Sequence, residues 1–402
     1  YNCAPSQGIV VVNSSTATVT AAGLSNTLDS KQYQITKVIL PSDNTDITAF
    51  TAAVKFNDAL YTGTYTTSAD SSNTSHTMSK GQVSVKNGET VTIPYVPSDY
   101  SAAVTETPPA GWILSGITSA EDAGNNTITY TITNIKTASL TATVNWLDNG
   151  SDLRPSSETE KGNLNLYYLI GDAKDPVKLT ADNCSDVGLL SVPAPADSSG
   201  TADGIDYYSY TYGSLPLATS EGKNITWSIA QDTAPDAYIS AITTNSSDAS
   251  NIKAVIANTL KMSFNAKIVW NDNATKATSR PDKVTLKLHR YSTTTADEIY
   301  KENIEVSGNN TDSTWSISEA DLPLYDSKGN QFIYYAVEAP VTSKQDGITY
   351  NTTYDNGTGT YGTETEKAYE GGSVENTINA TASANFKKEW KDNSDFEGYR
   401  SQ

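Results

Sequence analysis

The chain of 402 residues carries 46 acidic and 27 basic residues, a net charge of −19, and only 18% of its residues are charged. Such an acidic surface repels phosphate backbones and anionic lipid, which disfavours nucleic-acid and membrane-surface binding. Since no apolar run approaches the roughly 18 residues of a spanning helix, we expect no membrane insertion within this chain.

The first 27 residues are strand-like and precede the first recognisable module. They begin at Tyr1 with neither a basic nor an apolar leader, so we expect any secretory signal to have been removed. Cys3, in this segment, and Cys184 are the only cysteines. They either form a disulfide in an oxidising compartment or remain two isolated thiols.

Alternation of apolar and polar residues predicts half-buried strands along the rest of the chain, at 34–40, 127–132, 140–146, 264–270 and 283–288. Clusters of Asn, Asp, Gly and Ser predict loops at 68–75, 197–204 and 355–359. No helical periodicity is long enough for a βαβ unit, which disfavours α/β enzyme folds. We therefore predict an all-β fold of sandwiches in series.

A tryptophan followed two residues later by aspartate and three residues later by asparagine occurs at Trp146, Trp270 and Trp390. The copies recur roughly every 120 residues, about the length of one small domain. This period predicts modules at residues 28–137, 138–260 and 261–380. Residues 381–402 would then open a fourth module that is cut short, or supply a segment that completes a neighbouring subunit.

The second and third modules keep several separated signals in one order. The second reads SLTATVNWLDNGSDLRP, NLNLYYL, LPLATSEGKNITWSIAQ and KAVIANT, and the third reads FNAKIVWNDNATKATSRP, VTLKLHRY, LPLYDSKGNQFIYYAVE and SVENT. This order resembles the B-type repeat of collagen-adhesin proteins (Cna-B), over nearly all of residues 138–380. The first module, with YQITKVIL, a Pro-rich stretch from NGETVTIPYVP to PPAGW, and YTITN, resembles subunits of Gram-positive pilus backbones.

These resemblances imply tandem immunoglobulin-like, transthyretin-like sandwiches that can cross-link themselves through a Lys–Asn isopeptide bond. The chemistry requires a neutral lysine, which burial favours, and a protonated glutamate that polarises the asparagine carbonyl. In the first module Lys37, Glu106 and Asn134 each fall on the apolar face of a predicted strand. We predict a Lys37–Asn134 bond with Glu106 as the proton relay; the alternative is that some of the three face solvent.

The second module departs from this pattern, because Val144 replaces the lysine and Gln231 the glutamate. Asn258 remains, but it has no nucleophile, so we expect ordinary packing alone to hold this module.

A second candidate cross-link joins Lys267, Glu338 and Asn376 in the third module. Lys267 is one residue away from the family position, so it reaches the core only through a bulge and otherwise faces water. Asn379 competes with Asn376 as the acceptor. Lys388, two residues before Trp390, returns to the family position in the incomplete segment.

The resemblances imply a structural protein of the cell surface or cell wall, a pilus-like shaft or stalk whose partners are other copies of itself or other pilus subunits. An adhesin that binds host matrix protein or glycan through exposed tyrosines is the alternative, and a spacer attached to an enzyme is a third. We expect no enzyme acting on an external substrate, because His76 and His289 are too scattered for a zinc site or a triad. We expect no cofactor and no metal, although the Asp- and Asn-rich turns contain oxygen ligands that calcium could use.

Overall fold

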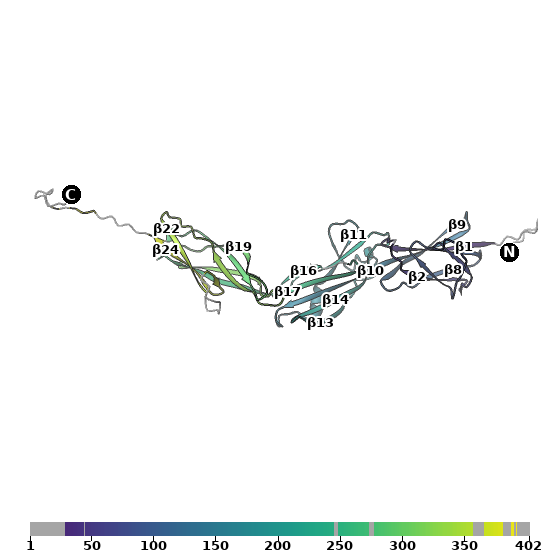
Figure 1. Cartoon of the computed structure of the whole chain (residues 1–402), viewed down its shortest axis with the longest axis horizontal. Helices are drawn as coiled ribbons and strands as arrows, with labels where there is room; N and C mark the ends of the chain where they lie inside the picture. Colours follow the sequence, from purple (N-terminus) through teal and green to yellow (C-terminus); the bar gives the residue numbers. More distant parts are fainter. Residues whose placement is uncertain are drawn as a thin grey trace, which may run out of the picture.

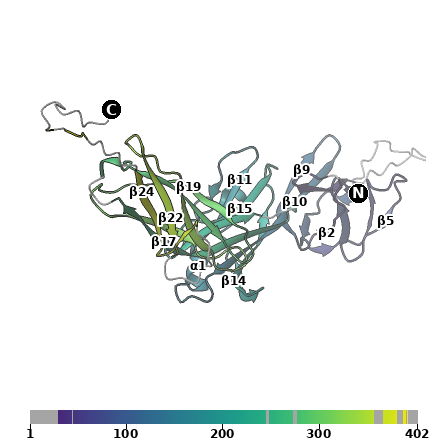
Figure 2. The ribbon, with the colours of Figure 1, turned by 60° about the vertical axis from the view of Figure 1, so that its left-hand side comes forward.

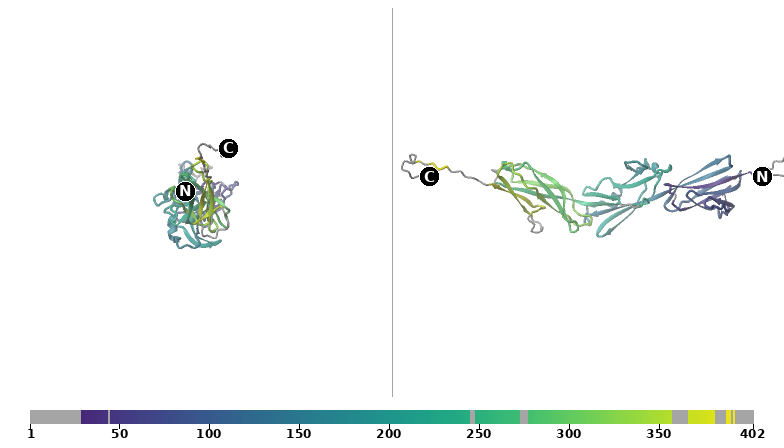
Figure 3. Two further views of the ribbon diagram at one scale, coloured as in Figure 1. Left: turned by 90° about the vertical axis from the view of Figure 1, so that its left-hand side faces the viewer. Right: turned by 45° about the horizontal axis from the view of Figure 1, so that its top comes forward.

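Three β-rich bodies, called here the first, second and third modules, follow one another along the chain in an elongated row (Figure 1). Seen along its length, the row has a compact outline (Figure 3). The computed structural model describes residues 29–43, 45–244, 248–272, 277–356, 366–380, 387–389 and 391. The predicted N-terminal extension, residues 1–27, lies outside these ranges.

The first module is a sandwich of two sheets. Its strands are β1 (Ser30–Leu40), β2 (Ala49–Phe56), β3 (Ala59–Leu60), β4 (Thr64–Thr67), β5 (His76–Thr77), β6 (Gln82–Lys86), β7 (Thr90–Pro97), β8 (Ala102–Glu106), β9 (Trp112–Asp122) and the first half of β10 (Thr127–Leu147). One sheet runs β5-β4-β7-β1-β10-β9, and the other places β2 between β6 and β8. Apolar residues of both sheets form a single core between them.

The second module begins in β10 and has the same two-layer design. Its further elements are α1 (Ser157–Asn163), β11 (Leu164–Ile170), β12 (Val177–Lys178), the 3-10 turn η1 (Cys184–Val187), β13 (Ala196–Ala202), β14 (Ile205–Pro216), β15 (Ile225–Gln231), β16 (Tyr238–Thr244) and β17 (Asn251–Asn271). One sheet runs β13-β14-β10-β17-β16, and the other runs β12-β11-β15. Trp146 and Trp227 lie in the core between the sheets.

The third module begins in β17. Its further elements are the 3-10 turn η2 (Ala277–Ser279), β18 (Val284–Tyr291), β19 (Glu298–Val306), β20 (Thr314–Pro323), β21 (Ile333–Glu338), β22 (Ile348–Asp355), β23 (Ala368–Tyr369) and β24 (Ser373–Ala380). One sheet runs β20-β17-β24-β22, and the other runs β19-β18-β21-β23. The prediction of all-β sandwiches in series is therefore confirmed.

Neighbouring modules share a strand instead of being joined by a linker. The first half of β10 pairs with β1 and β9, and its second half pairs with β14 and β17 of the next module. β17 is shared in the same way between the second and third modules. Figure 2 shows β10 leading from the first module into the second. The chain therefore passes through both junctions as extended, hydrogen-bonded backbone.

One local prediction was wrong, and one short helix was not predicted. The Ser- and Gly-rich stretch 197–204 is not a loop, because most of it forms β13, an exposed edge strand that pairs with β14 through its backbone. The hairpin turns at Asp203 and Gly204, both with positive φ, and an Asp-Gly pair is a strong hairpin signal. The helix α1 was also missed: Ser156 caps it by accepting a hydrogen bond from the backbone N–H of Thr159.

Candidate functional site

Each module carries a buried asparagine at an equivalent position in its sheet. In all three, the first and last strands are parallel neighbours, and the asparagine lies on the last strand. The residue opposite it on the first strand comes two positions after the site where the family has lysine. The register pairs are Ile39 with Asn134, Trp146 with Asn258, and Trp270 with Asn376. The lysine site is therefore held by Lys37, Val144 and Ile268 in turn.

The structure brings together the three residues predicted for the first module. Lys37 Nζ lies 2.7 Å from Glu106 Oε2, and Asn134 Nδ2 donates to Glu106 Oε1 at 2.5 Å. Lys37 and Asn134 are fully buried, and so is the Glu106 side chain. Strand alternation explains this, since Lys37 shares the inward face of β1 with Ile35 and Ile39.

Aromatic side chains surround the amine of this cluster. Lys37 Nζ lies 3.9 Å from the centre of the Phe50 ring, and Trp112 packs edge-on against that ring with centroids 5.1 Å apart. Burial lowers the pKa of the Lys37 amine, and the neighbouring Glu106 only partly opposes this shift. Among the described residues, Asn134 Oδ1 has no hydrogen-bond partner. The site therefore holds an amine, a carboxyl group and a carboxamide with an unused acceptor.

The second module has the asparagine without the lysine. Val144 and Asn258 are both fully buried. Gln231 donates from Nε2 to Oε1 of Glu160 at 2.7 Å, so α1 brings a carboxyl group that sequence reasoning missed. Burial raises the pKa of Glu160 to about 7. The signal that could have revealed α1 was Ser156 after a proline, followed by two glutamates in the first turn.

The third module pairs its glutamate with its asparagine but does not bring the lysine to them. Asn376 Nδ2 donates to Glu338 Oε1 at 3.1 Å, and Asn376 is fully buried whereas Asn379 is exposed. The candidate grouping of Lys267 with this pair is wrong: Lys267 is exposed, and Ile268 occupies the core. β17 pairs with β24 without a bulge at this point, so Lys267 stays on the outer face.

Burial also affects the carboxyl group of the third module. It raises the pKa of Glu338 to about 7, although hydrogen bonds from Asn376 and Thr352 act in the opposite direction. Glu338 therefore binds a proton near neutral pH, as an acid catalyst must. What this module lacks is the nucleophile.

The structure also explains the recurring Trp-x-Asp motif and the Arg-Pro turn after it. Arg154 Nη2 donates to Asp148 Oδ1 at 2.6 Å in the second module, and Arg280 makes the same bond to Asp272 at 2.6 Å in the third. Both aspartates are buried. These carboxylates therefore pair with arginine, and the described residues contain no group of three or more His, Cys, Asp or Glu suited to a metal ion.

Three other predicted positions stand apart from these sites. Cys184 is buried, and its Sγ donates to the carbonyl of Thr180 at 3.0 Å, whereas Cys3 lies outside the described residues. Lys388 is exposed and belongs to no strand; apart from residues 387–389 and 391, the predicted segment 381–402 lies outside the described residues.

In the described part of the chain, no helix has the length and apolar character needed to span a membrane.

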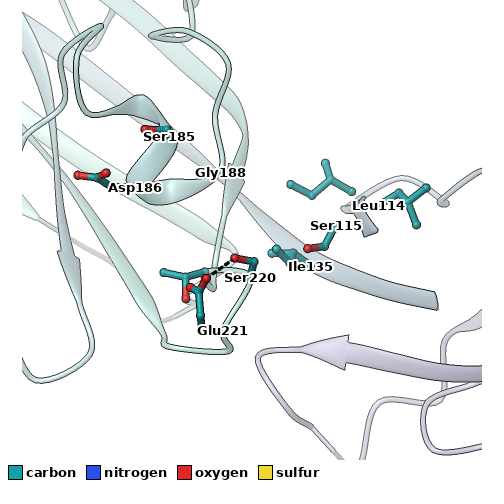
Figure 4. Close-up of a pocket in the computed structure, with 10 residues that line it drawn as sticks. Leu114, Ser115, Ile135, Ser185, Asp186, Gly188, Ser220 and Glu221 are labelled. Carbon is teal, nitrogen blue, oxygen red and sulfur yellow. Dashed lines mark hydrogen bonds between the residues drawn. The ribbon is translucent and has the colours of Figure 1, made fainter. Parts of the chain in front are cut away.

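A cavity of about 340 Å³ lies at the junction of the first and second modules (Figure 4). Ile113, Leu114, Ser115 and Ile135 of the first module line it, opposite Ser185, Asp186, Gly188, Thr219, Ser220 and Glu221 of the second. Ser220 donates to Glu221 within it. No basic side chain is among the lining residues, so the cavity offers no positive charge to attract an anion.

Two family models match parts of the chain. Residues 31–143 match a domain of unknown function, DUF7601, and residues 265–365 match the Cna protein B-type domain. No curated protein sequence matches the chain.

Several solved structures are similar in fold. Two B repeat units of the collagen-binding protein of Staphylococcus aureus are 17% identical, covering 88% of this chain and 76% of that one, with a TM-score of 0.21. The pilus adhesin SpaC of Lactobacillus rhamnosus GG is 12% identical, covering 89% of this chain and 44% of that one, with a TM-score of 0.26. A streptococcal ancillary pilin is 12% identical, covering 87% and 99%, with a TM-score of 0.27. At the level of sequence, the similarity to the Cna protein B-type domain covers residues 265–365.

Proposed function

We propose that this chain is a structural protein of the cell surface, a pilus-like shaft or stalk, whose first module closes an isopeptide bond between Lys37 and Asn134. The observation that carries the proposal is the buried contact of Lys37, Glu106 and Asn134. Burying the Lys37–Glu106 pair costs desolvation free energy that the attraction between the two groups offsets only in part. Covalent closure with Asn134 would give this buried polar cluster a role.

The proposed reaction is a single intramolecular transamidation. The neutral amine of Lys37 attacks Cγ of Asn134 while protonated Glu106 donates to Oδ1 of the carboxamide. The Nζ–Cγ bond forms, the Cγ–Nδ2 bond breaks, and Glu106 relays a proton from the amine to the departing nitrogen. One ammonia leaves, and no oxidant or other reactant is consumed. The packed core supplies the proximity that this slow exchange requires.

Shared strands suit a chain that carries tension. Force applied to the ends of the first module enters through β1 and leaves through β10, which are parallel neighbours. A bond between Lys37 and Asn134 would carry this load directly and bypass the hydrogen bonds between the strands. The second and third modules have only their ladders between first and last strands, β10 with β17 and β17 with β24.

The Leu-Pro loops brace both junctions in the same way. The backbone N–H of Leu217 donates to the carbonyl of Lys136 at 2.9 Å, and that of Leu324 donates to the carbonyl of Leu260 at 2.8 Å. Each of these loops therefore extends the pairing of β10 or β17 across the boundary. A braced, continuous strand favours a stiff rod over a string of independently moving beads.

The comparisons support the same class of function, since the third module is a Cna protein B-type domain and the fold relatives include pilins. On this basis the chain would lie at the cell surface or in the cell wall and would contact other copies of itself or other pilus subunits. Its only chemistry would be its own single cross-link.

Intact mass spectrometry of the reduced and denatured chain tests the proposal. The expected mass is lower than the sequence mass by one ammonia, and proteolysis should release Lys37 and Asn134 in one branched peptide. Glu106→Ala should restore the full sequence mass. An unmodified wild-type mass would refute the cross-link.

An adhesin is the second candidate, favoured by an aromatic cavity of about 280 Å³ in the first module. Tyr61, Tyr95 and Tyr100 line it with Pro94 and Pro97, and Tyr95 is 75% exposed with a φ of 59°. A bulky residue seldom adopts positive φ without a local reason. Binding of collagen peptides or glycans that is lost in Tyr95→Ala would support an adhesin, and no binding to either would leave the shaft alone.

A further inference from the structure

The strand that carries each buried asparagine has a second neighbour, on the side away from the first strand of the module. The pairing with this second neighbour differs between the modules. β16 runs beside β17 without interruption and places Ser240 opposite Asn258. β22 does the same beside β24 and places Thr352 opposite Asn376. In the second and third modules, a hydroxyl side chain therefore stands directly across from the carboxamide.

These hydroxyls bind the carboxamide oxygen. Ser240 Oγ donates to Asn258 Oδ1, and Thr352 Oγ1 donates to Asn376 Oδ1 at 2.9 Å. In the third module the carboxamide is then held on both sides, because Nδ2 donates to Glu338. Its oxygen points to the hydroxyl and its nitrogen to the carboxyl group.

The first module is built differently at this point. The pairing of β9 with β10 shifts between Thr133 and Asn134, so that Ser115 is an extra residue in a β-bulge. Leu114, the partner of Asn134, is 38% exposed and lines the junction cavity (Figure 4). No described residue donates a hydrogen bond to Asn134 Oδ1.

We propose that the residue opposite the asparagine sets how fast a module that carries the lysine can close its cross-link. A hydroxyl there, as at Ser240 and Thr352, holds the carboxamide oxygen by a hydrogen bond and slows the reaction. The bulge in β9 leaves the oxygen of Asn134 without a donor, so the carboxamide can turn this oxygen toward Glu106 without breaking a hydrogen bond to Oδ1. This inference rests on the cross-link proposed for the first module and adds a residue that controls the rate of the reaction.

The hydroxyl slows the reaction because it fixes which atom of the carboxamide faces the acid. Addition of the amine needs a proton on Oδ1, and in each proposed site the donor is the buried carboxyl group. In the third module Oδ1 meets Glu338 only after the carboxamide turns over and gives up the hydrogen bond from Thr352. A hydrogen bond of about 1 kcal/mol corresponds to a factor of about five in rate. In the first module the same rotation breaks no bond to Oδ1.

The test installs the missing nucleophile in the full chain and varies only the hydroxyl. Ile268→Lys restores the family lysine, and it is combined with Thr352 unchanged, with Thr352→Val, or with Thr352→Ser. Valine matches threonine in shape without the hydroxyl, and serine keeps the hydroxyl. Ammonia loss is followed by intact mass after refolding, and peptide mapping assigns the branched peptide to Asn376.

The Thr352→Val combination should close the new bond at least about fivefold faster than the threonine and serine forms. Equal rates in all three would overturn the inference, and so would no reaction in the valine form. A parallel set in the second module, Val144→Lys with Gln231→Glu, compares Ser240 with Ser240→Ala. It should give the same order of rates and covers the case in which the lysine at 268 prevents folding.

The cross-link of the first module and the role of the hydroxyls can be refuted independently of each other. The Lys37–Asn134 peptide is read in every sample, so its absence from wild type would refute the cross-link of the first module by itself. If that peptide is present and the hydroxyl variants react alike, only the role of Ser240 and Thr352 is refuted.

Discussion

Replacing Glu106 by glutamine should leave the first module uncrosslinked while changing its shape very little. Glutamine has the size of glutamate and can still bond to Lys37 and Asn134, but it cannot relay a proton. The chain should therefore keep its full sequence mass, one ammonia heavier than the mass expected of a cross-linked chain.

The loss in stability follows from the loop that the bond would close. About 100 residues separate Lys37 from Asn134, and closing a loop of that length removes about 4 to 5 kcal/mol of chain entropy from the unfolded state. A module of about 110 residues has an unfolding entropy of about 0.23 kcal/mol/K. Losing the bond should therefore lower the midpoint of the first module by about 20 °C.

Scanning calorimetry of the full chain measures this shift, and Lys37→Met serves as a second variant that removes the amine itself. Glu338→Gln is the matched control, because it makes the same change in a module that has no lysine at its site. It should leave both the mass and the first module's transition unchanged. A Glu106→Gln chain that still loses ammonia, or one that melts with the wild type, would refute the reasoning.

Three further predictions concern the rest of the chain. Between pH 5 and pH 8 the third module should lose about 2.5 kcal/mol of stability, because burial raises the pKa of Glu338 from 4.5 to about 7. Folding then favours the protonated form, and this stabilisation disappears as the pH rises through the folded pKa. Urea unfolding at several pH values should show this slope, and it should vanish in Glu338→Gln; the same slope in both would contradict it. Arg280→Ala should cost about 3 to 5 kcal/mol by removing the arginine that neutralises the buried Asp272, and Arg154→Ala should cost less because the Arg154 side chain is 15% exposed. Urea unfolding followed by tryptophan fluorescence compares the two losses, and equal losses would count against this account. Trypsin should spare Lys136 and Lys261, which lie at the junctions inside β10 and β17, and early cleavage at either would argue against continuous strands.

The predictions from sequence succeeded where a pattern is local. Four of the five predicted strands fall wholly within strands of the structure, and 283–288 does so except for Lys283, because a period of two along one segment already places one face in a core. Lys37 could be placed inside for the same reason, since it alternates with Ile35 and Ile39. The stretch 197–204 failed because its pairing uses only backbone groups, which side-chain alternation does not report.

The all-β class, the modular order and the residue types of the first site could be predicted from the sequence, because alternation and motif spacing are read along the chain without knowing which strands pair. The folded structure was needed to show that Lys267 faces water, that Glu160 contacts Gln231, and that a hydroxyl lies opposite Asn376 but not opposite Asn134. These facts depend on the register between strands far apart in the chain. A shift of one residue turns a side chain from the core to the solvent, and no local pattern encodes it.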